Sequence, residues 1–169
     1  MLIQKYIYYY DLLHELVLRD LRLRYRRSVL GLLWTLVNPL AQLLVLTLVF
    51  RFILPLEIPN YSLFLFTGLL AWNWFQSSLF SGTGSIVESR ELLRRPGFPI
   101  GVLPVVNVLS SFIHFMLALP ILILFMHLSE VPFRLAFLIL PIVFTFQFVL
   151  SLGLIYLLAT IQVRFRDTQ

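Results

Sequence analysis

The chain contains no cysteine among its 169 residues, so it can form neither a disulfide, nor a thiolate metal site, nor a cysteine nucleophile. Charged side chains are also scarce, at 12% of the residues, whereas hydrophobic side chains make up 60% and the mean hydropathy is +0.92. Ordinary soluble domains carry about 25% charged residues. The apolar residues occur in runs too long for helices that expose one face to water, which indicates an all-α integral membrane protein.

Motifs for nucleotide and peptide hydrolysis are missing as well. The sequence has no G-x-x-x-x-G-K-[ST] P-loop and no H-E-x-x-H pair. Its histidines, His14, His114 and His127, lie at different predicted depths, so they form no catalytic cluster. No Asp or Glu falls within a predicted span, which argues against an ion-driven carrier. We therefore expect this chain to be no enzyme and to bind no metal or cofactor.

Four largely apolar runs are long enough to cross a membrane as helices, since about 20 residues suffice. We place the transmembrane segments at residues 29–54, 61–81, 102–127 and 135–163. The Ser-Gly-Thr-Gly-Ser run at 81–85 is interpreted as the exit of the second span, because clustered glycine and serine commonly mark loops.

The basic residues fix the expected direction of these spans. Of the 13 Lys and Arg residues, only Arg51 and Arg134 fall on one side of the predicted bundle. The others lie on the opposite side: Lys5, Arg19, Arg22, Arg24, Arg26, Arg27, Arg90, Arg94, Arg95, Arg164 and Arg166. The positive-inside rule makes that side, and both termini, cytoplasmic. The net charge of +5 therefore reflects membrane topology, and we expect no nucleic acid partner.

Residues 1–27 predict an amphipathic helix at the membrane interface. At 100° per residue one stripe contains Asp11, Glu15, Arg19, Arg22 and Arg26, and the opposite stripe contains Tyr6, Tyr10, Leu13 and Val17. Such a helix would contact membrane lipids. A plain basic anchor that holds the first span in place explains the pattern equally well.

A short charged helix is predicted between the second and third spans, over residues 86–95. Ser85 and Glu88 have the spacing of a capping box, which would start the helix, and Pro96-Gly97 would end it. This cytoplasmic helix could dock a partner. A positively charged turn that only fixes topology is the simpler interpretation of the same residues.

Polar and tryptophan side chains in or near the spans are candidates for lining a passage: Trp34, Asn38, Gln42, Trp72 and Trp74. Amides within a membrane also join helices by hydrogen bonds, and Gln147 shares this ambiguity. Tryptophans near span ends more commonly form an interfacial belt than a surface for sugar stacking. His114 is expected to be a neutral side chain bonded to a neighbouring helix.

The stretch Arg-Asp-Leu-Arg-Leu-Arg-Tyr-Arg-Arg-Ser-Val-Leu-Gly-Leu-Leu-Trp at 19–34, followed by Asn38-Pro39, closely resembles the permeases of polysaccharide-exporting ABC transporters. These ABC-2 type permeases export lipid-linked O antigens, capsular polysaccharides and teichoic acids. Phe98-Pro99 with Leu103-Pro104, and the Val-Arg-Phe-Arg-Asp run at 163–167, also look like the family's pattern. The resemblance covers the whole chain.

The resemblance implies a permease subunit in the bacterial inner membrane, working as a homodimer with a separate ATPase subunit that binds ATP and Mg²⁺. Residues 1–27 would be the family's gate helix and residues 86–95 its coupling helix. Candidate gate residues are Arg19, Asp20, Arg22, Arg24, Tyr25, Arg26 and Arg27. Candidate ATPase-coupling residues are Glu88, Arg90, Glu91, Leu92, Leu93, Arg94, Arg95, Phe98 and Pro99.

The chain departs from the family pattern in two places. Ile100 and Gly101 stand where the family often has a basic and an acidic residue. The family's permeases also continue past the turn near residue 167, so we expect a carboxyl-terminal part of the family domain to be absent. Two alternatives remain: an ABC-2 exporter of another lipid or a drug, and a truncated membrane scaffold without transport activity.

Overall fold

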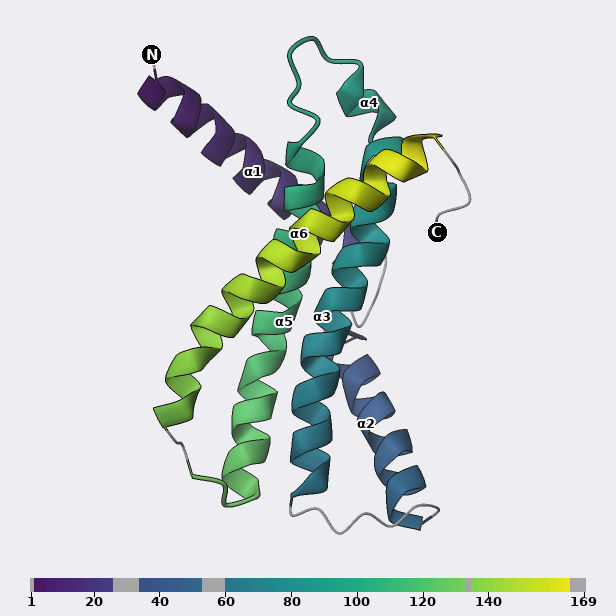
Figure 1. Cartoon of the computed structure of the whole chain (residues 1–169), viewed down its shortest axis with the longest axis vertical. Coiled ribbons are helices and arrows are strands. Elements are labelled where there is room, and N and C mark those ends of the chain that lie inside the picture. The colour runs from purple at the N-terminus through teal and green to yellow at the C-terminus, as the bar shows by residue number, and fades with distance from the viewer. Residues whose placement is uncertain (1, 26–33, 53–59, 133–134, 165–169) are drawn as a thin grey trace.

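The computed structural model describes residues 2–25, 34–52, 60–132 and 135–164, and these residues form helices without any strand (Figure 1). The helices are α1 (Leu2–Tyr25), α2 (Trp34–Phe52), α3 (Tyr61–Glu88), α4 (Arg90–Leu93), α5 (Val102–Leu128), the 3-10 helix η2 (Leu135–Ile139) and α6 (Leu140–Arg164). The all-helical fold expected from the sequence is therefore confirmed for these residues.

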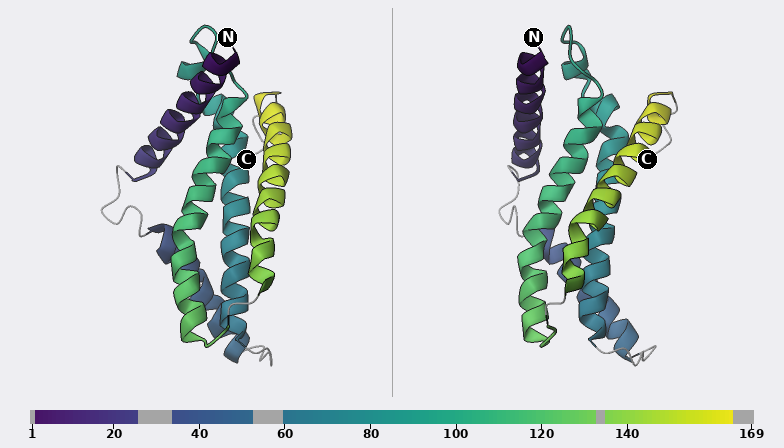
Figure 2. Two further views of the ribbon diagram at one scale, coloured as in Figure 1. Left: turned by 90° about the vertical axis from the view of Figure 1, so that its left-hand side faces the viewer. Right: turned by 60° about the vertical axis from the view of Figure 1, so that its left-hand side comes forward.

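A bundle of α3, α5 and α6 forms the centre of the molecule. The helix α6 crosses α3 and α5 obliquely, while α2 packs against one half of α3 (Figure 1). Figure 2 shows α1 and α6 on opposite sides of the α3–α5 pair. The short α4 lies at one end of the bundle, at the end opposite the connection between α5 and η2 (Figure 1).

Trp74 occupies the middle of the main apolar core and is 2% exposed. Its ring lies 5.0 Å from Phe112, 5.1 Å from Phe115 and 6.2 Å from Phe144, measured between ring centroids. These four aromatic side chains come from α3, α5 and α6, so the cluster joins all three helices of the bundle. Offset and edge-on aromatic pairs add to the stabilisation that burial alone provides.

Small residues bring α3 and α6 into close contact beyond the aromatic cluster. A Cβ placed on Gly82 would lie 2.5 to 2.9 Å from three side-chain atoms of Ile155, which is fully buried. Ser78 on α3 and Ser151 and Ala159 on α6 are also fully buried. Small residues at such crossings let helix backbones approach closely, which is how helices associate where lipid replaces water.

Side-chain amides connect the helices at two further points. The Gln147 amide on α6 donates a hydrogen bond to the Ala71 carbonyl on α3 at 2.9 Å. Asn73 on α3 donates to the side-chain oxygen of Gln42 on α2 at 3.2 Å. Two of the three amides considered for a polar passage, Gln42 and Gln147, thus form a hydrogen bond to a neighbouring helix.

The predicted helix boundaries agree with the structure for the last two apolar segments and disagree around residue 85. The predicted ranges 102–127 and 135–163 correspond to α5 and to η2 with α6. The predicted helix start at residue 86 is wrong, because α3 continues through the Ser-Gly-Thr-Gly-Ser run to Glu88. Ser85 does not cap a new helix, since its hydroxyl donates to the Gly82 carbonyl within α3 at 2.6 Å.

In the parts of the chain that the structure describes, two helices are long and apolar enough to cross a membrane by themselves: Val102–Leu128 and Phe137–Arg164. Within the described residues α2 contributes only a shorter apolar stretch, Val37–Val49. The helix α3 would be about 42 Å long at 1.5 Å per residue, but it includes Asn73, Gln76 and several Ser and Thr residues. The count of four spans thus depends on the sequence pattern and is taken up below as a proposal.

Replacing Gly82 with alanine should lower the free energy of unfolding by about 1–3 kcal/mol, because the new methyl group would overlap the Ile155 side chain. The matched control is Gly68→Ala on the same helix, where no atom lies within 4 Å of the new Cβ. That change should stabilise α3 by up to about 1 kcal/mol through helix propensity. Thermal unfolding in detergent measures both, and equal midpoints would contradict the close contact.

Candidate gate and coupling site

The predicted gate helix α1 is held against α5 by a second apolar core. Leu16 and Val17 of α1 pack with Val102 and Val106 of α5, and all four side chains are buried. Partly buried side chains surround this core: Tyr9, Leu12, Leu13, Leu21, Leu92, Phe98, Leu109 and Ile113. Because Leu92 and Phe98 belong to the predicted coupling residues, the core joins the gate helix to the coupling segment, defined here as residues 86–95 with Phe98 and Pro99.

The two predicted stripes of α1 have different surroundings. Asp11, Glu15, Arg19 and Arg22 are exposed, as expected for the charged stripe. Leu13 and Val17 of the apolar stripe contact protein, whereas Tyr6 and Tyr10 are 76% and 71% exposed. The apolar stripe therefore does not present one uniform surface to lipid, because its second half is covered by α5.

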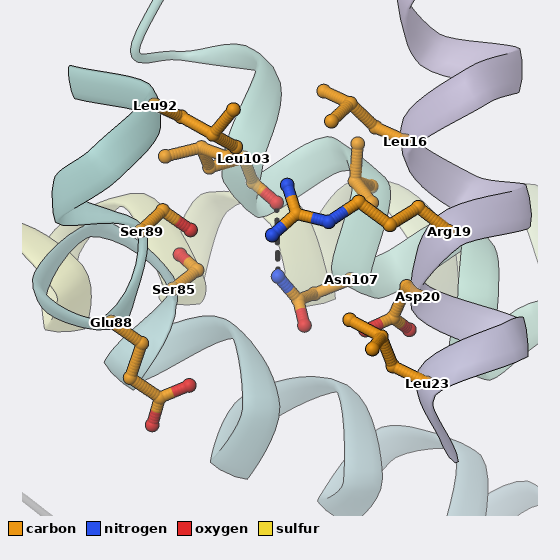
Figure 3. A pocket seen from close by; sticks show the side chains of 11 residues that line it. Leu16, Arg19, Asp20, Leu23, Ser85, Glu88, Ser89, Leu92, Leu103 and Asn107 are labelled. Carbon is orange, nitrogen blue, oxygen red and sulfur yellow. Dashed lines mark hydrogen bonds between the residues drawn. The ribbon is translucent and has the colours of Figure 1, made fainter. Parts of the chain in front are cut away.

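A cleft of about 230 Å³ lies where α1, the end of α3, α4 and the start of α5 meet (Figure 3). We call it the gate cleft. Its lining residues are Leu16, Arg19, Asp20, Leu23, Ser85, Glu88, Ser89, Leu92, Leu103, Val106 and Asn107. Residues predicted separately for the gate, Arg19 and Asp20, and for coupling, Glu88 and Leu92, thus line one cavity.

The gate cleft combines apolar walls with charges of both signs. The Arg19 guanidinium extends from α1 into the space between the helices, and Glu88 lies across it at the end of α3 (Figure 3). The Asn107 amide donates to the Leu103 carbonyl of its own helix at 3.0 Å, so it is already engaged. The arrangement can hold the gate helix and the coupling segment at a defined separation, and it contains no nucleophile paired with a base.

The coupling segment carries an exposed charged surface. Arg90, Glu91, Arg94 and Arg95 are exposed, whereas Leu92 and Leu93 are half-buried. Backbone hydrogen bonds from Arg95 to the Leu92 carbonyl and from Phe98 to the Arg95 carbonyl fold the chain back after α4. Gly97 adopts a positive φ of 78°, which glycine accommodates without strain. The turn places Phe98 against the apolar core beside α1.

The remaining predicted gate residues are described only in part. Arg22 is exposed on α1, and Arg24 and Tyr25 fall within the last turn of that helix. Arg26 and Arg27 lie outside the described residues. Their predicted role stays a prediction.

The candidates for a passage are not brought together. Trp34 is the first residue of α2, Asn38 and Gln42 are exposed on that helix, and Trp72 is 59% exposed. The expectation for Trp74 is wrong, because its ring is enclosed by Phe112, Phe115 and Phe144 and has no free face. The sequence could not reveal this, since the three aromatic neighbours come from α5 and α6, which are distant from Trp74 in the sequence.

Among the described residues, no three His, Asp or Glu side chains group into a metal site. His114 is half-buried on α5. Among the polar residues that line the gate cleft, the sequence analysis missed Ser89 and Asn107. Ser89 lies within the predicted coupling helix and Asn107 near the start of the third predicted span, and no motif marks either residue.

No family model matches the chain, but it is similar to known proteins over nearly its whole length. It is 40% identical over 169 residues to an O-antigen export system permease protein RfbA of Myxococcus xanthus, covering 99% of this chain and 65% of that protein. Two RfbA permease proteins of Klebsiella pneumoniae are 33% and 31% identical over 163 residues, each covering 96% of this chain and 63% of that protein.

Long apolar helices with a docked surface helix, together with these relatives, define the chain as a helical membrane protein. The chain therefore resembles permeases of O-antigen export, in agreement with the family resemblance of its sequence. It spans less than two thirds of the length of the relatives that it matches.

The docking of α1 can be tested with one buried and one exposed position on that helix. Val17→Asp should accelerate hydrogen exchange of the α1 amides roughly tenfold or more, because a carboxylate in an apolar core costs several kcal/mol. The matched variant Tyr6→Asp alters an exposed side chain of the same helix and should leave exchange near residues 12–21 unchanged. Similar exchange in both variants would contradict the docking.

Proposed function

We propose that this chain is the permease subunit of an ABC exporter that moves a lipid-linked polysaccharide across the inner membrane. A separate ATPase subunit supplies the energy, and two permeases work together as a homodimer. One observation carries the proposal: the helix predicted as gate and the segment predicted for coupling share an apolar core and the gate cleft. The three O-antigen export permeases support the choice of a polysaccharide substrate.

The geometry suggests how ATP binding on the partner would reach the gate. The exposed charges Arg90, Glu91, Arg94 and Arg95 offer the ATPase a surface for salt bridges and hydrogen bonds. On the inner side of the same segment, Leu92 and Phe98 contact the core that holds α1. A push on the outer side would therefore change the packing of α1 against α5, because close-packed side chains transmit displacement.

The proposed topology has four membrane spans with both termini in the cytoplasm. It is supported by the distribution of Lys and Arg and by the position of α4 at the opposite end of the bundle from the end of α5. The apolar lengths of α5 and α6 are consistent with two of these spans. The connection at 128–134 would then face away from the cytoplasm.

Single cysteines test this topology directly, because the natural chain has none. In intact inner-membrane vesicles turned inside out, Glu91→Cys should react with a membrane-impermeant maleimide, and Glu130→Cys should react only after the membrane is permeabilised. Both side chains are exposed, so protein burial does not protect either position. Equal labelling of both positions before permeabilisation would contradict the topology.

Binding to the proposed ATPase subunit tests the function. Reversing two exposed charges with Arg94→Glu/Arg95→Glu should weaken capture of the ATPase in detergent at least about tenfold, since like charges across an interface cost several kcal/mol. The control Glu130→Arg inverts an exposed charge two residues after the end of α5, which lies at the opposite end of the bundle from α4, and it should bind normally.

Failure of the unmodified chain to bind the ATPase would contradict the proposal and favour a membrane scaffold. Normal binding by the double variant would place the ATPase contact outside the coupling segment. Export of a lipid-linked glycan from reconstituted vesicles, with another lipid as competitor, would then identify the substrate.

A further inference from the structure

Two consecutive residues of α6 contact the chain on both sides of the coupling segment. Ile155 packs against Gly82, six residues before α3 ends at Glu88. Tyr156 donates a hydrogen bond from its hydroxyl to the carbonyl of Gly101, just before α5 begins. The stretch from Gly82 to Gly101, which includes all of α4, is thus held by α6 at both its ends.

The contact at Gly82 is steric. The nearest Ile155 atoms to a Cβ at position 82 are Cγ2, Cδ1 and Cγ1, at 2.5, 2.8 and 2.9 Å. Two of these are attached directly to the branched Cβ of Ile155, which has few allowed rotamers, so the side chain cannot simply swing away. Ile155 is fully buried and therefore fixes the spacing of α3 and α6 at this point.

The contact at Gly101 is directional. The Tyr156 oxygen lies 2.6 Å from the Gly101 carbonyl oxygen, a short distance for a hydroxyl donor. A Cβ on Gly101 would lie 3.8 Å from the same hydroxyl, in ordinary contact, so the bond does not depend on glycine at this position. The hydrogen bond joins residues 55 positions apart in the sequence, and it links α6 to the connection that follows the coupling segment.

We propose that Ile155 and Tyr156 form a clamp, a pair of positioning residues that makes α6 move together with the coupling segment. The proposal rests on the proposed function, because it assigns to the same coupling segment a second helix to which its motion is transmitted. The first helix is α1, which the coupling segment contacts through Leu92 and Phe98. The clamp adds α6, a helix long and apolar enough to cross the membrane.

The clamp fits the weak attachment of α4 to the rest of the molecule. Arg90 and Glu91 of α4 are exposed, as are Arg94 and Arg95 directly after it. Leu92 is the α4 residue that packs against the core shared with α1. A short helix attached in this way would bend locally under load unless the chain on both sides were fixed. Ile155 and Tyr156 provide that fixation from a single turn of one helix.

The test measures the distance between the coupling segment and α6 in the full chain. Spin labels are placed on Glu91→Cys and Val163→Cys, two exposed positions in a chain that has no other cysteine. Tyr156→Phe keeps the ring and removes only the hydroxyl. This change should raise about fivefold the fraction of molecules whose distance between the labels differs from the main value, as expected for the loss of one hydrogen bond.

Matched variants distinguish the loss of the clamp contacts from a nonspecific destabilisation of α6. Thr160→Val removes a hydroxyl one turn away that bonds only within α6, to the Tyr156 carbonyl, and should leave the distances unchanged. Gly82→Ala should shift the main distance, and Gly82→Ala/Ile155→Ala should restore it, because alanine removes the three overlapping atoms. Unchanged distances in both Tyr156→Phe and Gly82→Ala would overturn the clamp.

A second measurement uses the full chain in complex with its ATPase. Tyr156→Phe should bind the ATPase as tightly as the unmodified chain but export about fivefold less glycan per ATP hydrolysed. An unchanged ratio would overturn the role of Tyr156 in coupling. If the unmodified chain neither binds the ATPase nor exports, the proposed function fails, and the distance measurement still decides whether the clamp exists.

Discussion

The close approach of α3 and α6 at Gly82 is the contact on which the other features depend. It lets α3 continue unbroken to Glu88, and the length of α3 places the coupling segment beyond the end of the bundle. The same approach allows Trp74 to meet aromatic side chains from α5 and α6. A larger residue at position 82 would separate the two helices and loosen both the aromatic cluster and the base of the coupling segment.

The sequence predicted the apolar helices α5 and α6 well because charged or proline residues bound their runs. It failed at residues 81–85, where two glycines indicated a loop. Glycine costs a helix about 1 kcal/mol relative to alanine. Here close packing against Ile155 offsets that cost, and the packing partner lies some 70 residues away in the sequence, beyond any local pattern. The burial of Trp74 could not be predicted for the same reason, since its aromatic neighbours come from helices that are distant in the sequence.

Charges and motifs also identified residues of the candidate site, but they did not predict that these residues lie close together in the structure. Arg19 and Glu88 were assigned to different functions from family resemblance, and the structure places both around the gate cleft. The periodicity of α1 identified its charged stripe, but it could not show that Leu16 and Val17 face protein while Tyr6 remains exposed. An apolar stripe has the same period whether lipid or another helix covers it.

The two connections from the coupling segment differ in physical character. The contact of Leu92 and Phe98 with α1 is apolar and non-directional, so it tolerates sliding as long as burial is kept. The contact with α6 combines a hydrogen bond of defined geometry with a steric fit of Ile155 to Gly82, and neither tolerates much displacement. Motion of the coupling segment would therefore carry α6 along rigidly, whereas α1 could shift its register on α5. The proposed function requires that freedom of α1, because a gate would have to change position relative to the bundle that it closes.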